Sequence, residues 1–314
     1  MAAWYLGSTK WTAVPAWAAL TAYSVGDFVR QLATPSVGNE RVWRCTTAGT
    51  SLAAEPSWTL TKGSTTTEVA GPIWTEVTGN SSYGWSAPHA RLANAFAWMA
   101  AGDDSYVSHS HAETQSTAMT LTSPGTAVSP CRVLCVSDAG SVPPVSADHA
   151  TTATISTTGA SSITRRGFTY YRGITITAGS GANSASNTDA GIGVAFWSKY
   201  ELCAIRLGGT SGGTIGFGAS GGVKDQSVEL VNTTFQFAAT SQSIVARCRV
   251  VWSGTASAIT GATFPTTLFI PTSDSAASVK VVGVDLSALG SGKNLVSVST
   301  AEYSEYSFLD CKLG

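Results

Sequence analysis

The acidic side chains that could act in catalysis are few and far apart. Three of them, Asp285, Glu302 and Glu305, lie near the C-terminal end. Enzymes that cleave polysaccharides use two carboxylates, one as general acid and one as base or nucleophile. If successive turns of the chain stack, Asp285 could lie beside Glu302 or Glu305, so these three are the catalytic candidates. Isolated acids at turns more often cap the backbone and solubilise the surface, which favours a protein without catalytic activity.

A second polar group, at residues 103–113, includes Asp103, Asp104, His109, His111 and Glu113. On a strand His109 and His111 would share a face, so a metal site with Glu113 is one possibility. We favour the alternative, a solvated edge or turn network, and predict no metal and no cofactor. The glycine-rich segment 208–213 lacks the following Lys-Ser/Thr pair of a phosphate-binding loop and predicts a turn.

Charge and cysteine content exclude several classes. With 18 basic and 19 acidic residues the net charge is −1, so the chain lacks the basic footprint of a nucleic-acid-binding protein. No CxxC pair occurs, and the scattered cysteines are predicted to be reduced and buried. The N-terminal residues do not have the pattern of a secretory signal, and the longest helix-like apolar segment, 92–101, is too short to span a membrane.

Tryptophan content divides the chain. Eight of the 10 tryptophans lie in the first 98 residues, which predicts a small Trp-rich β module at 1–80 and a second part at 81–314. The second part begins with a predicted helix over 88–101, in which Leu92, Phe96 and Met99 share one face and Gly102 supplies the stop.

After this helix, short β-branched runs alternate with turns of small residues, and no second helix of comparable length follows. Two architectures remain: a sandwich or barrel built from hairpins, and a parallel solenoid of stacked coils. The chain contains no Asn-Gly or Asp-Gly pair, the usual sequence of a tight hairpin. We therefore favour the solenoid, with the helix capping its first coil.

Two resemblances refine this interpretation. The segments Trp17–Arg30, Val42–Cys45, Glu55–Trp58 and Trp74–Val77 resemble carbohydrate-binding modules of the chitin-binding type 5/12 group. The resemblance implies that exposed aromatic faces stack on sugar rings. Its sugar-binding candidates here are Tyr23, Trp43 and Trp58, whereas Trp17 and Trp74 are expected in the core. The alternative is that all five are packing residues and the module is an attachment adaptor.

From Leu92 to Ile176 the chain is similar to the N-terminal end of a right-handed parallel β-helix of the pectate-lyase-like type. Similar sequences occur in virion proteins of tailed bacteriophages. The resemblance implies a structural protein of the particle (capsid decoration, head fibre or tail appendage), located in the virion after assembly in the host cytoplasm. Its expected partners are other virion proteins, further copies of itself, as a trimer, and cell-surface glycan, with no nucleic acid and no membrane insertion. The alternative function is a polysaccharide depolymerase, a lyase or glycoside hydrolase of the tailspike type.

Overall fold

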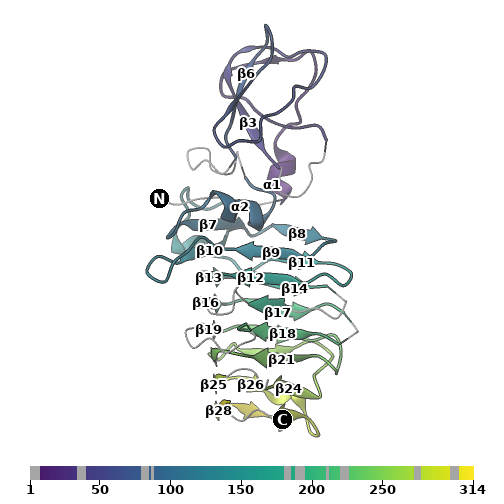
Figure 1. The fold of residues 1–314 in the computed structure, drawn as a ribbon, viewed down its shortest axis with the longest axis vertical. Helices are drawn as coiled ribbons and strands as arrows, with labels where there is room; N and C mark the ends of the chain where they lie inside the picture. The colour runs from purple at the N-terminus through teal and green to yellow at the C-terminus, as the bar shows by residue number, and fades with distance from the viewer. Residues whose placement is uncertain are drawn as a thin grey trace.

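The computed structural model describes residues 8–33, 40–78, 85, 88–179, 185–187, 195–209, 212–219, 226–271, 277–297 and 304–314. The chain is mainly β, as predicted, and its two parts contain different sheets (Figure 1). The predicted boundary near residue 80 lies outside the described residues. No helix in the described ranges is both long and apolar enough to cross a lipid bilayer.

The N-terminal part contains a short helix and two antiparallel sheets. Helix α1 spans Ser8–Ala13, and the four-stranded sheet has the order β2 (Phe28–Arg30), β3 (Val42–Thr47), β6 (Ile73–Glu76) and β5 (Thr65–Thr67). Strands β1 (Ala22–Tyr23) and β4 (Gly49–Thr50) form the second sheet. Aromatic area supplies much of this small core, since the side chains of Trp17, Trp43 and Trp74 are all buried.

Helix α2 spans Leu92–Trp98, so the predicted helix over 88–101 is too long at both ends. Arg91 and Met99 have extended backbones and bound the helix. The carboxylate of Glu113 accepts a hydrogen bond from the backbone N of Leu92 at 2.9 Å, which satisfies one of the free N–H groups of the first turn. A tertiary contact therefore helps to define where this helix begins.

The second part consists of three parallel sheets, through which the chain passes in rotation (Figure 1). The first sheet contains β7 (Asp104–Ser108), β10 (Cys131–Val136), β13 (Thr169–Arg172), β16 (Phe196–Glu201), β19 (Gln226–Val231), β22 (Arg249–Ser253), β25 (Ser278–Val282) and β28 (Glu305–Leu309). The second contains β8 (Ala112–Gln115), β11 (Ala153–Thr157), β14 (Ile174–Ala178), β17 (Ala204–Leu207), β20 (Thr234–Gln236), β23 (Ala258–Thr260), β26 (Asp285–Leu286) and β29 (Lys312–Leu313). The third contains β9 (Met119–Thr122), β12 (Ile163–Arg166), β15 (Ala185–Asn187), β18 (Thr214–Phe217), β21 (Ser243–Ala246), β24 (Thr267–Ile270) and β27 (Asn294–Val296), and two 3₁₀ turns cover Ser146–Asp148 and Ser287–Leu289.

We call one passage through the three sheets a coil. Within each of these three sheets, neighbouring strands come from successive coils and pair in parallel, so the hairpin sandwich, the alternative predicted from sequence, does not apply to this part. Alternate side chains point inward and line up from coil to coil. One such column in the first sheet contains Val133, Tyr171, Tyr200, Leu230, Trp252, Val281 and Phe308. The buried apolar side chains form one cluster that begins under α2 and continues to Leu289.

In six successive coils the corner between the first and second sheets begins with a residue that has a positive φ, directly after the strand of the first sheet. These residues are Gly173, Leu202, Asn232, Gly254, Gly283 and Asp310, with φ between 48° and 104°. A left-handed backbone costs about 1–2 kcal/mol for most L-amino acids. At the corners without glycine, the pairing of the strands on either side compensates this cost. Glycine is required at position 173, where a Cβ would lie 2.0 Å from the carbonyl oxygen of Ala150.

The N-terminal part packs on the first coil through apolar and charged contacts. Trp11, Val14, Val42 and Val77 form a cluster against which Ala90 packs. The buried carboxylate of Glu40 forms an ion pair with Arg91 and accepts a hydrogen bond from Asn94 of α2. The two parts are thus joined through groups that water does not reach freely.

Candidate functional site

The three aromatic candidates of the N-terminal module pack on its core. Trp43 is 0% exposed, and its ring stacks on Trp58 with centroids 4.3 Å apart. Since neither face of Trp43 is open to a sugar ring, the structure does not support a sugar-stacking role for this residue. Trp58 and Tyr23 are half-buried, and Tyr23 lies with its ring centroid 4.8 Å from that of Trp74. Trp17 and Trp74 are buried, as expected for core residues.

A buried carboxylate that the sequence did not single out organises this core. Glu68 is 2% exposed and accepts hydrogen bonds from the indole nitrogens of Trp17 at 3.0 Å and Trp74 at 2.7 Å. It also accepts the backbone N–H of Leu52 at 2.8 Å. Three donors compensate the desolvation of its charge. Glu68 thus holds the two core indoles of Trp17 and Trp74, whereas the indole of Trp58 donates to Glu55 at 2.8 Å.

The acid candidates for catalysis are not brought together among the described residues. Asp285 lies in the second sheet in register with Lys312, whereas Glu305 begins β28 of the first sheet in register with Ser278. Glu302 lies outside the described residues. Hydrogen bonds from Ser287, together with the hydrogen bond and positive charge of Lys312, lower the pKa of Asp285 to about 2. A general acid needs a raised pKa, whereas the pKa of Asp285 is lowered, so Asp285 is not suited to that role.

The predicted shared face of His109 and His111 is wrong, because both residues lie in the turn between β7 and β8 rather than on a strand. His109 is exposed beside Asp138, whereas His111 is buried with Nε2 3.5 Å from a carboxylate oxygen of Glu113. That carboxylate also binds the start of α2. Within the described ranges, no group of three or more His, Cys, Asp or Glu side chains could hold a metal ion.

The cysteines are free, and all but Cys311 are buried, as predicted. Burial raises the pKa of the Cys203 and Cys248 thiols to about 12, so these two are not reactive thiolates at neutral pH. In the glycine-rich segment 208–213, residues 208, 209, 212 and 213 are described, and they lie between β17 and β18 without helical structure, as a turn would.

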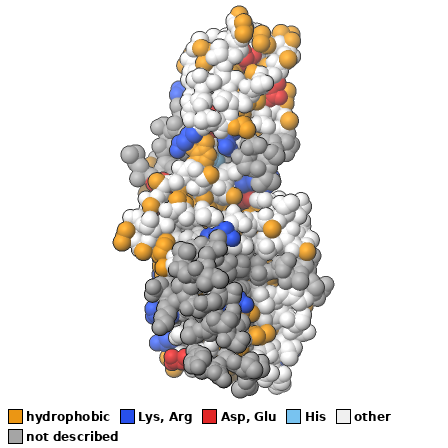
Figure 2. Space-filling model, viewed as in Figure 1, with side chains coloured by type: hydrophobic (Ala, Val, Ile, Leu, Met, Phe, Trp, Pro, Cys, Tyr) orange, Lys and Arg blue, Asp and Glu red, His pale blue; other side chains and the backbone are white. Residues whose placement is uncertain are grey.

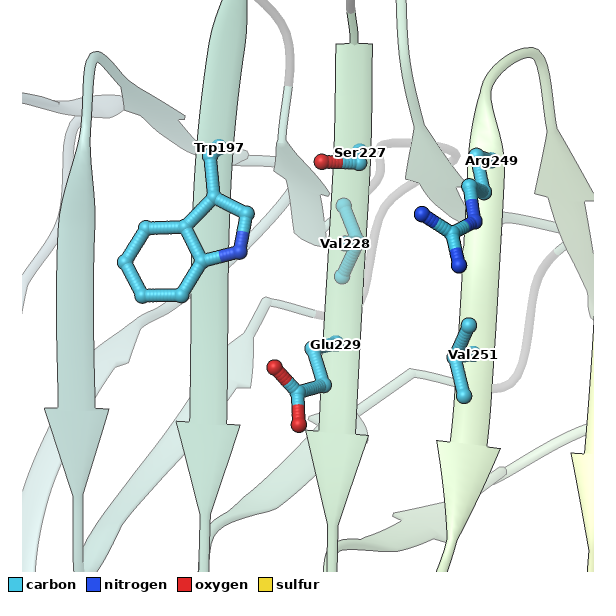
Figure 3. A pocket seen from close by; sticks show the side chains of 6 residues that line it. All are labelled: Trp197, Ser227, Val228, Glu229, Arg249 and Val251. Atoms are coloured by element: carbon cyan, nitrogen blue, oxygen red, sulfur yellow. The ribbon is translucent and has the colours of Figure 1, made fainter. Parts of the chain in front are cut away.

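A hollow on the outer face of the first sheet is a further candidate site. Its volume is about 260 Å³, and it is lined by Trp197, Ser227, Val228, Glu229, Arg249 and Val251 (Figure 3). Residues Trp197, Ser227 and Arg249 form one row across strands β16, β19 and β22, and Glu229 and Val251 belong to the next outward row. Three coils therefore build the hollow together.

The indole of Trp197 and the guanidinium of Arg249 stand on either side of the hollow, with the carboxylate of Glu229 between them (Figure 3). Trp197 is half-buried and Arg249 is exposed. Lys199 forms an ion pair with Oε1 of Glu229 at 3.3 Å, which holds this carboxylate at the edge of the hollow. The site thus combines one aromatic face, one anion and one cation on a rigid sheet.

The wall that carries the hollow is rich in charged side chains. The outer face of the first sheet also carries the pair of Arg132 with Asp104 at 2.5 Å and the pair of Arg172 with Glu201. The outer face of the second sheet is instead rich in hydroxyls, exemplified by the hydrogen bond between Thr114 and Ser156. The first wall therefore offers charged donors and acceptors, whereas the second offers neutral hydroxyls.

This arrangement is suited to binding a sugar ring. The apolar C–H face of a pyranose can stack on an indole, while its hydroxyls can donate to a carboxylate and accept from a guanidinium. The volume is slightly below the range of pockets for drug-sized ligands, which suits a single small ring unit of a longer chain. Among the residues lining the hollow, Glu229 is the one carboxylate, whereas glycoside hydrolysis uses two.

A second surface feature is the apolar tip of the N-terminal module. We define the tip by Leu20, Leu52 and Val69, which are 72%, 43% and 81% exposed. The backbone N of Leu20 donates to the carbonyl of Leu52, whose own N–H donates to Glu68, the residue before Val69. Figure 2 shows hydrophobic side chains gathered at this end of the molecule. Leu20 has a φ of 51°, a left-handed conformation that is strained for leucine.

Sequence reasoning missed the hollow, although one signal was present. Trp197 follows the inward Phe196 and precedes the inward Ser198, so alternation alone places its indole outside. Comparison of the chain with known protein families, curated proteins and solved structures finds no match.

Proposed function

We propose that this chain is a structural attachment protein that contacts carbohydrate through the hollow of Trp197, Glu229 and Arg249. In this proposal the three parallel sheets form a right-handed parallel β-helix, capped by α2, that acts as a stiff rod. The observation that carries the proposal is the hollow itself, because an outward indole beside a carboxylate and a guanidinium matches both the apolar face and the hydroxyls of a sugar.

We further propose that the rod belongs to the particle of a tailed bacteriophage and docks there through the apolar tip. Exposed leucine and valine side chains of neighbouring segments support a protein contact at this end, since an apolar patch in water is stabilised by a partner. A homo-oligomer, expected as a trimer, stays a prediction. An antibody raised against the chain is expected to label purified particles of the phage that encodes it, at regular positions on each particle. Purified particles of that phage that lack the chain would contradict this part of the proposal.

The carbohydrate contact is tested by binding of the chain to an array of bacterial surface polysaccharides. We expect Trp197→Ala to weaken binding at least about tenfold, because loss of the stacking face removes roughly 1.4 kcal/mol or more. Trp58→Ala tests the half-buried aromatic candidate of the N-terminal module separately, and we expect it to leave the affinity unchanged. Leu20→Ser with Val69→Ser, at the tip, is also expected to leave the affinity unchanged.

The same polysaccharides distinguish binding from cleavage. A binding protein releases no new reducing ends during prolonged incubation, whereas the depolymerase alternative predicts release that is lost in Glu229→Gln or Asp285→Asn. Release of this kind would overturn the non-catalytic proposal. Equal affinity of the wild-type chain and Trp197→Ala would overturn the assignment of the hollow.

A further inference from the structure

His89 is a fully buried histidine where the N-terminal part meets the first coil, a contact that we call the joint. It precedes α2, which Figure 1 shows between the N-terminal sheets and the stack. His89 is 0% exposed, and neither of its ring nitrogens has a hydrogen-bond partner among the residues that the structure describes. Such a site favours the neutral imidazole, because the charged form loses far more hydration on burial.

Two cations of the N-terminal part face the same aromatic ring as His89. The ring of Trp98, in α2, has its centroid 5.7 Å from that of His89. Lys62 places its Nζ 4.6 Å from the centroid of the Trp98 ring, and Arg41 places its Cζ 5.7 Å from it. These cation–π contacts connect the N-terminal part to α2. The joint therefore gathers one imidazole and two positive charges around a single indole.

The buried carboxylates of this region have other partners. Glu40 forms its ion pair with Arg91, whereas Glu76 accepts hydrogen bonds from two backbone N–H groups and has Oε1 3.8 Å from Nε of Arg41. The stretches of the N-terminal part outside the described residues contain no charged side chain and no histidine in their sequences, at 1–7, 34–39, 79–84, 86 and 87. These stretches therefore add no acid that could compensate a charge on His89.

Burial, and after it the positive charges of Arg41 and Lys62, lower the pKa of His89 from 6.5 to about 3. In a joint that has opened to water, the imidazole regains an ordinary pKa near 6.5. The closed joint is thus fully favoured above pH 6.5 and loses this contribution as the pH falls toward 3. We propose that the joint is an acid-sensitive switch, in which one proton taken up by His89 separates the N-terminal part from the first coil. This switch is independent of the hollow on the outer wall.

Two other groups respond to acid and must be kept apart from His89 in the test. Burial raises the pKa of Glu76, so acidification would favour the closed joint if opening exposed this carboxyl. Burial also lowers the pKa of His149, which follows β10 in the second coil. Unfolding of the whole chain would sum all these groups, so the measurement has to report on the joint itself.

Hydrogen–deuterium exchange of the wild-type chain, followed by mass spectrometry and corrected for the intrinsic effect of pH, measures opening of the joint. A helix as short as α2 is unstable in water without its contacts, so separation exposes its amides to exchange. Between pH 7.5 and 5.0 we expect protection of segment 88–98 to fall about 30-fold, as pKa values of about 3 closed and 6.5 open require. Segment 226–253 of the stack is expected to keep its protection. Equal protection of 88–98 across this range would overturn the proposal, and this measurement needs no variant.

His89→Phe assigns the switch to its residue, because phenylalanine keeps a ring against Trp98 and cannot take up a proton. We expect this variant to lose the pH dependence of protection at 88–98. His109→Phe is the matched control at an exposed histidine of the first coil, and it is expected to keep the 30-fold change. If folded His89→Phe shows the same pH dependence as the wild-type chain, another group drives the opening and the assignment to His89 is wrong.

Discussion

Trp252→Ala is expected to lower the free energy of unfolding by about 3–5 kcal/mol, the range for removing a fully buried large aromatic side chain. Trp252 is 0% exposed and stands in register between Leu230 and Val281 in the inward column of the first sheet. Its ring meets Phe235 edge to face at 4.8 Å, and its Nε1 donates to the carbonyl of Thr233 at 2.8 Å. Alanine would leave a cavity that two rigid coils cannot close, together with a buried carbonyl that has lost this donor.

Trp197→Ala is the matched control, because it makes the same substitution two coils earlier on the outer face of the same sheet. Trp197 is half-buried and lines the hollow, so its loss is expected to cost below about 1 kcal/mol. Urea unfolding followed by far-UV circular dichroism measures both variants. If the two substitutions cost the same, the column of inward side chains is not the core that the register implies.

The alternation of residue types was enough to predict strands and their inward faces. In β16, for example, Phe196, Ser198 and Tyr200 are buried and the residues between them are half-buried, as period-two alternation requires. The pairing partners were less accessible to prediction, because each strand bonds to strands one full coil away in the sequence. Loops of different length separate the coils, so no fixed repeat in the sequence states the register.

Side chains that depend on tertiary partners escaped prediction for a related reason. The start of α2 depends on Glu113, and the extended backbone of Arg91 precedes it. Neither fact can be read from the helical pattern, which continues to earlier residues. Similarly, Trp197 is placed outside by alternation alone, but Glu229 and Arg249 join it only through the register of three strands. The residues of the hollow are thus far apart in sequence and adjacent only after folding.

Buried charges are a further class that the residue pattern did not identify as structural. Glu68 and Arg165 occur in segments without other unusual features, yet Glu68 collects three donors and Arg165 is enclosed without an anionic partner among the described residues. For Arg165 a signal was present, since it follows Ile163 at the inward spacing of the strand. An ionised residue at an inward position of an otherwise apolar pattern is a useful marker, because such a position tolerates charge only with compensation.

The second large effect is expected at the joint between the N-terminal part and the first coil, where Arg91→Met should destabilise the chain by about 3–5 kcal/mol. The carboxylate of Glu40 is 4% exposed and is held by Arg91 and by Asn94. Removing the arginine leaves this carboxylate buried and charged, with the amide of Asn94 still donating to it. Urea unfolding measures the loss.

A double replacement separates the cost of an uncompensated charge from the cost of lost packing. Glu40→Gln combined with Arg91→Met removes both charges, keeps an acceptor for Asn94 and preserves the volume of each side chain. We expect the pair of changes to recover most of the stability that Arg91→Met alone loses, since a buried ion pair contributes little net stability compared with neutral groups of the same shape. A loss below about 1 kcal/mol in Arg91→Met would instead place this pair among solvent-screened surface ion pairs. In that case the joint would be held by the apolar cluster of Trp11, Val14, Val42 and Val77, and substitutions there would carry the larger effect.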